Sequence, residues 1–360
     1  MRVLEVCTSP SLGGLELYFI SCCNHLHDAK EVEIWAYVKN ESLIHKNLKN
    51  SINTGVEKSN NLFQRVKSLL AVISHFQPQI VHSHNKTDLL PIALAKVFSR
   101  RSFKHVHTRQ MNLPGRKKNP FHYFLYKQVD SLIAITERLK NQILKNTTIN
   151  PEKVRVLYYG VPEAGSDFVK LDETKNNANF KVGLFARIDA KKNQHVLLEA
   201  LSLLKNKGID VSAYLIGRPT DELYTQKLEN MIAQLDLHQQ VKMMGFVQNP
   251  INKMRNFDVI LLTSADETFG LVLAEAMRAG VAVIGADGGG VPEIIEHEKS
   301  GLLFEPNNPE SLAGELEKLI INKDLVDQLA INGKKIADEK FNEEKHFKSL
   351  RQILKDVSNT

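Results

Sequence analysis

The sequence has few cysteines and no long apolar run, and both absences narrow its class. Its 360 residues include only Cys7, Cys22 and Cys23, and none of them forms a C-x-x-C pair. We therefore expect free thiols in a reducing compartment and no disulfide framework or metal site built on cysteine. No stretch of 18 or more apolar residues occurs, so we expect no membrane-spanning helix. Glu5 interrupts the first apolar residues, which speaks against a signal peptide and favours a cytoplasmic location.

A nicotinamide-binding fingerprint is also missing. The glycine-bearing loop of residues 8–14 follows an apolar run at residues 2–7 and precedes a helical pattern, but it does not read G-x-G-x-x-G. What is present is ordinary for a globular protein, with 42% hydrophobic and 24% charged residues and a net charge of +6. The length implies about two domains, each large enough to bury its own core.

Residues 257–301 are the stretch around which the chain is organised. They predict a buried strand at 257–264, a polar loop, a helix at 271–279 closed by Gly280, a second strand at 281–286 and a glycine turn at 288–290. In a parallel sheet, ligands bind beyond the carboxyl ends of the strands. A helix that begins there, next to Gly270, presents free backbone N–H groups to an anion such as a phosphate.

Two glutamates flank the start of this helix. Glu267 stands just before it, and Glu275 lies one turn inside it among apolar neighbours. Glu267 could simply interact with the helix dipole, and Glu275 could pair with Arg278 on a surface face. The functional alternative is that both carboxylates bind the hydroxyl groups of a ligand, since a carboxylate with apolar neighbours needs a partner.

The segment Glu267–Glu275 resembles the E-x7-E signature of the retaining glycosyltransferases of family 4. The internal Phe-Gly, the following Glu-Ala-Met and the Gly-Gly-x-x-Glu at 289–293 agree with that family. The resemblance implies an α/β protein of the GT-B fold, with two Rossmann-like domains facing across a cleft. It also implies transfer of a sugar, with retention of configuration, from a nucleotide-diphosphate sugar to a glycan or lipid-linked acceptor. We favour UDP-sugars over GDP-sugars and a role in lipopolysaccharide or cell-surface polysaccharide synthesis.

Other segments extend the resemblance along the chain. Arg187 and Lys192 match the cations of the family's G-R-x-x-x-x-K loop, although Ala186 replaces the usual glycine. The alternative is that these residues form a basic surface loop without a ligand. Gly13, Gly14 and Glu16 match the Gly-Gly-x-Glu loop that borders the donor diphosphate and the acceptor. Phe246 falls in the segment placed against the nucleobase, whereas Gly217-Arg218-Pro219 departs from the family's G-x-G-P.

The resemblance implies roles for specific residues. Those expected to take part in catalysis are Arg187, Lys192, Glu267 and Gln110. Those expected to bind the donor are Gly13, Gly14, Arg187, Lys192, Phe246, Glu267, Thr268, Phe269, Gly270, Leu271, Val272 and Glu275. No D-x-D motif is placed to hold a metal, so we expect a metal-independent enzyme without a cofactor.

The acceptor side is expected to include His84, Arg109 and Gln110. Residues 78–84 predict a strand that ends in His82 and His84, for which no third metal ligand is evident. Family members usually carry T-x-H after the next strand, and here Gln110 occupies the histidine position. Gln110, Arg109 or His107 could therefore take over the polar contact.

Domain boundaries follow from composition and from the resemblance. We predict an acceptor-binding domain at 1–163, a polar linker at 164–179, a donor-binding domain at 180–341 and a final helix at 342–360 that crosses back to the first domain.

Residues 89–129 carry no acidic residue, but they carry nine lysines and arginines interleaved with aromatic residues. This pattern favours contact of residues 96–127 with an anionic membrane, over a solvated face or a nucleic-acid site. Two other classes remain as alternatives to the transferase, a noncatalytic nucleotide-sugar binding protein and a basic nucleic-acid binding protein. An epimerase is a weaker alternative within the fold.

Overall fold

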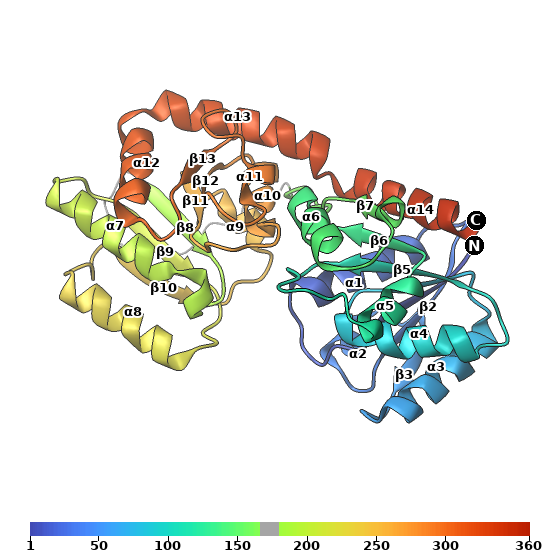
Figure 1. Cartoon of the computed structure of the whole chain (residues 1–360). Helices are drawn as coiled ribbons and strands as arrows, with labels where there is room; N and C mark the ends of the chain where they lie inside the picture. Colours follow the sequence, from blue (N-terminus) through green and yellow to red (C-terminus); the bar gives the residue numbers. More distant parts are fainter. Residues whose placement is uncertain (166–179) are drawn as a thin grey trace. The chain divides into compact units, whose positions relative to one another are not determined.

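Alternating apolar strands and amphipathic helices build two separate parallel sheets (Figure 1). The computed structural model describes residues 1–165 and 180–360, so the predicted linker at 164–179 falls almost wholly outside the described residues. The chain divides into a first unit, Met1–Tyr158 with Glu344–Thr360, and a second unit, Tyr159–Glu343. The domain borders predicted from the sequence are at 163 and 342.

The first unit contains a seven-stranded sheet in the order β3-β2-β1-β4-β5-β6-β7. Its elements are β1 (Arg2–Cys7), α1 (Gly14–His27), β2 (Glu33–Lys39), α2 (Leu43–Asn47), β3 (Asn53–Glu57), α3 (Leu62–Phe76), β4 (Ile80–Ser83), η1 (Lys86–Asp88), α4 (Leu89–Phe98), β5 (Lys104–Arg109), α5 (Pro120–Lys127), β6 (Ser131–Ala134), α6 (Glu137–Asn146), η2 (Pro151–Lys153), β7 (Val154–Val156) and α14 (Glu343–Ser358).

The second unit contains a six-stranded sheet in the order β10-β9-β8-β11-β12-β13. Its elements are β8 (Lys181–Phe185), η3 (Ala190–Lys192), α7 (Gln194–Asn206), β9 (Ser212–Ile216), α8 (Glu222–Gln234), β10 (Val241–Gly245), α9 (Pro250–Met254), β11 (Val259–Leu262), α10 (Leu271–Arg278), β12 (Ala282–Ala286), α11 (Val291–Ile294), β13 (Leu302–Phe304), α12 (Pro309–Ile321) and α13 (Lys323–Lys340).

Strand alternation explains how helices cover both faces of the second sheet. Val259 and Leu261 of β11 join a buried core with residues of α7, α8 and α12. The residue between them, Ile260, is equally buried but lies outside that core, since successive side chains of a strand point to opposite faces. Helix α10 contacts β11 and β12, and it packs against α9 and α13 rather than α7. Both faces are thus covered, as expected of a doubly wound parallel sheet.

Helix α14 completes the core of the first unit. The ring of Phe347 stacks on His25 of α1 with ring centroids 4.0 Å apart. The neighbouring His346 accepts or donates a 3.0 Å hydrogen bond with the hydroxyl of Tyr18. Leu350 and Leu354 are fully buried. The last helix of the chain therefore packs on the first.

The glycine turn after β12 needs glycine for a steric reason. Gly289 has a φ of +63°, and a Cβ at this position would lie 2.0 Å from the backbone oxygen of Glu267. The next residue, Gly290, donates a 2.7 Å backbone hydrogen bond to that same oxygen. The turn is thus pressed against the loop that carries Glu267, and it fixes the position of that loop.

This packing predicts that Gly289→Ala destabilises the protein by about 3 kcal/mol, because both the backbone conformation and the close approach oppose a Cβ. Urea unfolding followed by circular dichroism measures the change. The matched control is Gly314→Ala in α12, where nothing lies within 4 Å of the new Cβ and where alanine should stabilise the helix by up to about 1 kcal/mol. Equal midpoints for the two variants would contradict the steric argument.

Candidate functional site

The strand order of the second sheet reverses between β8 and β11. Open α/β sheets have their ligand-binding crevice at the carboxyl ends of the strands beside such a reversal. The loop after β8 carries Arg187 and Lys192, and the loop after β11 carries Glu267 and leads into α10. Residues 75 positions apart in sequence therefore meet at one edge of the sheet. This is where ligands bind in open α/β sheets.

Lys192 and Glu267 contact each other directly. The Nζ atom of Lys192 forms an ion pair with Oε1 of Glu267, and the two side chains are only 22% and 23% exposed. The hydroxyl of Thr263 donates a 2.6 Å hydrogen bond to the carbonyl of Lys192. The end of β11 thus holds the end of the β8 loop. The structure brings together a cation and a carboxylate that the sequence assigned to one site.

Glu275 has no hydrogen-bond or ion-pair partner among the described residues. It is half-buried, and burial raises its pKa from 4.5 to about 7. The alternative pairing with Arg278 is wrong, since Arg278 bonds Asp338 of α13 at 2.6 Å. A half-buried carboxylate without a partner is a candidate for binding a ligand hydroxyl.

Helix α10 begins at the same edge. Its N-cap, Gly270, has a φ of +100° and gives no side-chain cap, while Leu271 and Val272 of the first turn are half-buried. Thr268 is half-buried as well. Phe269 is 3% exposed, and its ring packs edge-on against Tyr159 and Phe341, at 5.2 and 5.6 Å. The ring of Phe269 therefore anchors the loop in the core of the second unit.

Two predicted residues lie at the exposed rim. Arg187 is 62% exposed and reaches Asp189 at 3.8 Å. Phe246, at the end of β10, is 61% exposed, and the guanidinium of Arg218 lies 4.9 Å from its ring centroid. Arg218 follows β9 in the segment that departs from the family pattern. Its cation–π contact holds the exposed ring of Phe246 next to the end of β9.

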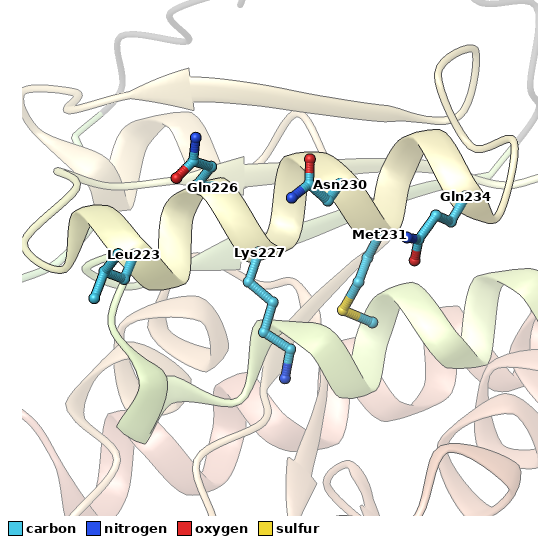
Figure 2. A pocket seen from close by; sticks show the side chains of 6 residues that line it. All are labelled: Leu223, Gln226, Lys227, Asn230, Met231 and Gln234. Atoms are coloured by element: carbon cyan, nitrogen blue, oxygen red, sulfur yellow. The ribbon is translucent and has the colours of Figure 1, made fainter.

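A cavity of about 360 Å³ lies elsewhere on the second unit. Six residues of α8 line it: Leu223, Gln226, Lys227, Asn230, Met231 and Gln234 (Figure 2). None of the residues predicted to bind the donor or the acceptor belongs to this set. It is a surface groove along one helix, without the converging charges of the crevice.

In the first unit, the loop of Gly13 and Gly14 is held by Glu16. The carboxylate of Glu16 accepts hydrogen bonds from the Ser9 hydroxyl at 2.5 Å and from the Gly13 amide at 2.7 Å. Glu16 is buried, whereas Gly13 and Gly14 are exposed. The acid of the Gly-Gly-x-Glu motif thus shapes the loop, and the glycines present its backbone to solvent.

Glu5 bonds His84, a predicted acceptor-side residue, and the sequence patterns missed it. Its Oε1 atom bonds His82 at 2.8 Å and its Oε2 atom bonds His84 at 2.7 Å. Burial alone would raise the pKa of Glu5, but the two histidines lower it to about 2. Burial, followed by the neighbouring His82, lowers the pKa of His84 to about 4. The network extends to Thr108, whose hydroxyl bonds His82 at 2.7 Å.

Glu5 also corrects the expectation that His82 and His84 lack a third ligand. The three side chains offer ligand atoms within 4.8 Å of one another. However, both carboxylate oxygens already accept short hydrogen bonds, and the remaining nitrogen of His82 already has a partner. The donor set therefore closes on itself as a buried hydrogen-bond network. Strand β1 supplied the missing member, 77 residues away from His82.

Gln110, rather than Arg109 or His107, lies beside His84. The amide nitrogen of Gln110 is 3.4 Å from Nδ1 of His84. His107 bonds Ser83 at 2.9 Å on the other face of the sheet, where burial holds its pKa well below the usual range. Arg109 donates to the carbonyls of Met111 and Asn112, at 2.8 and 3.0 Å, and so supports the following loop.

A second polar cluster sits where the strand order of the first sheet reverses, between β1 and β4. Asp88 accepts hydrogen bonds from the amide and the hydroxyl of Thr8. Arg65 lies 3.3 Å from Asp88 and bonds Glu57 at 2.6 Å. Burial raises the pKa of Asp88 to about 6 in spite of these donors. No sequence motif had singled out these residues.

The basic segment is divided by its contacts. Lys96 belongs to the predicted basic segment, but its charge is not free for a membrane. It pairs with Asp130 and donates a 3.0 Å hydrogen bond to the carbonyl of Gln128. Three apolar side chains, Met111, Phe121 and Tyr123, are at least half exposed. The exposed cations of the same loop and helix are Arg116, Lys118 and Lys127.

Two family models match nearly the whole chain. The model described as Glycosyltransferase Family 4 matches residues 12–164, and the model described as Glycosyl transferases group 1 matches residues 167–336. The chain is similar to the capsular polysaccharide biosynthesis glycosyltransferase CapM of Staphylococcus aureus, with 26% identity over 313 residues and 81% of each chain covered. It is also similar to the putative colanic acid biosynthesis glycosyltransferase WcaL of Salmonella typhimurium, with 26% identity over 66% of this chain and 59% of the relative.

Solved structures agree on the fold. The structure of Anabaena Alr3699/HepE in complex with UDP has a TM-score of 0.87 at 23% identity, covering 99% of this chain and all of that one. A glycosyltransferase from Rickettsia africae has a TM-score of 0.87 at 22% identity, covering 99% and 98%. The GT-B architecture predicted from the sequence is thereby confirmed.

The pKa of Glu275 predicts a pH-dependent stability difference. Because the folded-state pKa is raised from 4.5 to about 7, folding favours the protonated acid, and stability is lost as the pH rises from about 4.5 to above 7. Glu275→Gln removes this loss and should be about 2 kcal/mol more stable than the wild type at pH 8, with no gain at pH 4. Urea unfolding across this range measures the difference. The control is Glu229→Gln on the exposed face of α8, and a gain independent of pH would contradict the argument.

Proposed function

The chain belongs to glycosyltransferase family 4, and from this premise we propose that it transfers a sugar from a nucleotide-diphosphate sugar to a glycan or lipid-linked acceptor. The donor is a UDP-sugar in preference to a GDP-sugar, and the anomeric configuration is retained. The product belongs to lipopolysaccharide or cell-surface polysaccharide synthesis. The names of CapM and WcaL support a role in polysaccharide synthesis. The similar structure of Anabaena Alr3699/HepE in complex with UDP-glucose supports a UDP-sugar as the donor.

One observation carries the proposal: Lys192, Glu267 and the start of α10 converge at the switch point of the second sheet. A diphosphate needs cations and backbone N–H groups, and a sugar needs carboxylates that accept from its hydroxyls. All of these groups are present at this edge. No comparable convergence occurs along the α8 groove.

The proposed mechanism depends on stabilising the leaving group. Lys192, Arg187 and the amides of Gly270 and Leu271 stabilise the negative charge that grows on the departing diphosphate. Glu267 holds the donor sugar and Glu275 the ribose hydroxyls. Thr268 and Val272 border the donor at the start of α10, with Phe269 holding their loop through its buried ring, while Phe246 lies against the base. These donors need no metal, and the absence of a D-x-D motif supports a metal-independent reaction without a cofactor.

The first unit supplies the acceptor side in this proposal. Gln110 and His84 form a hydrogen-bonded pair at the carboxyl edge of β4 and β5, and they orient an acceptor hydroxyl. The exposed backbone of Gly13 and Gly14 borders the diphosphate and the acceptor. Arg109 contributes by holding the loop of Met111 and Asn112.

A nucleotide-binding panel tests the proposal. UDP, GDP, ADP and their glucose or mannose derivatives are added to the protein, and the thermal unfolding midpoint is measured. A ligand at about a hundred times its Kd adds about 2.7 kcal/mol of stability, and Glu275→Ala should abolish most of the shift for the true donor nucleotide. Glu229→Ala is the matched control. An unchanged shift in Glu275→Ala removes Glu275 from the site.

Two further assays separate the alternative functions. Slow hydrolysis of the bound donor sugar distinguishes an enzyme from a noncatalytic binding protein. Salt-dependent binding to arbitrary DNA, without any effect of nucleotides, favours a nucleic-acid binding protein.

We propose further that the loop of residues 111–119 and α5 dock on an anionic membrane from the inner face. No described helix is both long and apolar enough to cross a bilayer, so contact would be peripheral. Met111, Phe121 and Tyr123 provide exposed apolar groups, and Arg116, Lys118 and Lys127 provide charge beside them.

The docking proposal predicts binding to vesicles that contain phosphatidylglycerol. The double variant Phe121→Ser and Tyr123→Ser should bind about ten-fold more weakly in a sedimentation assay, because it loses the apolar part of the contact. Phe63→Ser is the matched control, since Phe63 is 75% exposed on α3, outside this segment. Equal binding of both variants, or no preference for anionic over neutral vesicles, would disprove the docking surface.

A further inference from the structure

The contact between Lys192 and Glu267 has a consequence for which ligands the crevice accepts. The lysine assigned to the diphosphate is already neutralised by the carboxylate assigned to the sugar. Both side chains are more than three-quarters buried, so neither charge is well solvated. A diphosphate that binds Lys192 must therefore replace the carboxylate of Glu267 as its partner, or share the lysine with it.

Among the described residues, only Lys192 forms an ion pair with Glu267. Arg187 is the next predicted cation, and its ion-pair contact is with Asp189 at 3.8 Å. The backbone oxygen of Glu267 bonds Gly290, so the loop cannot swing away without breaking the contact between the two turns. A carboxylate that is more than three-quarters buried and loses its cation incurs a free-energy cost until another donor reaches it.

We infer that Glu267 is a specificity-determining residue that favours an intact nucleotide sugar over the free nucleoside diphosphate. This inference rests on the function proposed above. The hydroxyls of a bound sugar donate to Glu267 and offset the loss of Lys192. A free nucleoside diphosphate brings no such donors, and its terminal phosphate places additional negative charge beside the carboxylate. The discrimination is a difference between two affinities, created by a repulsive contact as well as by an attractive one.

The same contact favours release of the product. When the sugar leaves, Glu267 loses its hydroxyl partners and competes again for Lys192. The diphosphate that remains is bound more weakly than it was as part of the donor. Inorganic phosphate and unrelated diphosphates are disfavoured for the same reason.

Glu267→Gln tests the inference, because it removes the charge and keeps the shape. The probes are UDP and UDP-glucose, with GDP and GDP-mannose in parallel, and the measurement is isothermal titration calorimetry at constant ionic strength. The variant should bind the free diphosphate about ten-fold more tightly than the wild type, equivalent to about 1.4 kcal/mol. Its affinity for the nucleotide sugar should not rise in parallel, so the preference for the sugar form falls by at least about ten-fold.

Asp287→Asn is the matched control. Asp287 is exposed at the carboxyl end of β12, so this variant removes one negative charge from the same edge of the sheet without touching Lys192. It should change both affinities by less than about two-fold, since exposed charges are screened. Glu267→Asp, which keeps the charge but shortens its reach, should lie between the wild type and Glu267→Gln, and it replaces the latter if Glu267→Gln fails to fold.

The outcomes separate the inference from the proposed function. If the wild type binds a diphosphate and Glu267→Gln binds it no more tightly, the role of Glu267 in discrimination is overturned while the donor site stands. An equal gain for the free diphosphate and for the nucleotide sugar overturns it as well. If none of the nucleotides binds the wild type or any variant, the proposed function itself fails.

Discussion

The reversal of strand order between β8 and β11 is the constraint on which the second unit depends. It brings the loop after β8 and the loop after β11 together at one edge of the sheet, although no local sequence pattern connects them. The start of α10 and the glycine turn after β12 then reach the same edge. The close approach of Gly289 to the backbone of Glu267 holds this loop in position. The strand order of the sheet thus determines which side chains can meet at this edge.

The charges in the two units differ in how they are compensated. In the first unit, Glu5 is fully buried yet keeps a low pKa, because two histidines bond both of its oxygens. In the second unit, Glu275 has no such partner and its pKa rises to about 7. A satisfied network stabilises structure, whereas an unsatisfied carboxylate at a ligand-binding edge remains available for binding.

Local patterns predicted the parts of the fold that depend on local physics. The strand Arg2–Cys7 and the helix that starts at Leu271 and ends before Gly280 occur where apolar periodicity and the glycine C-cap place them. Interactions across the sheet could not be predicted in this way. The partner of Arg278 is Asp338, 60 residues away, and the third member of the histidine cluster is Glu5. The burial of the Phe269 ring could not be predicted either, because its partners Tyr159 and Phe341 are distant in sequence. The strand Asn53–Glu57, with a central glycine and few apolar residues, also gave no signal.

Helix α14 makes the first unit discontinuous in sequence, and this affects how the chain folds during translation. Phe347, Leu350 and Leu354 follow the second unit in the sequence, yet they belong to the core of the first unit. On the ribosome, the face of α1 that contacts Phe347 therefore stays uncovered until residues 159–343 have been translated. A chaperone that binds exposed apolar surface would find its target on this nascent face, and a premature stop before residue 344 would leave that face open permanently.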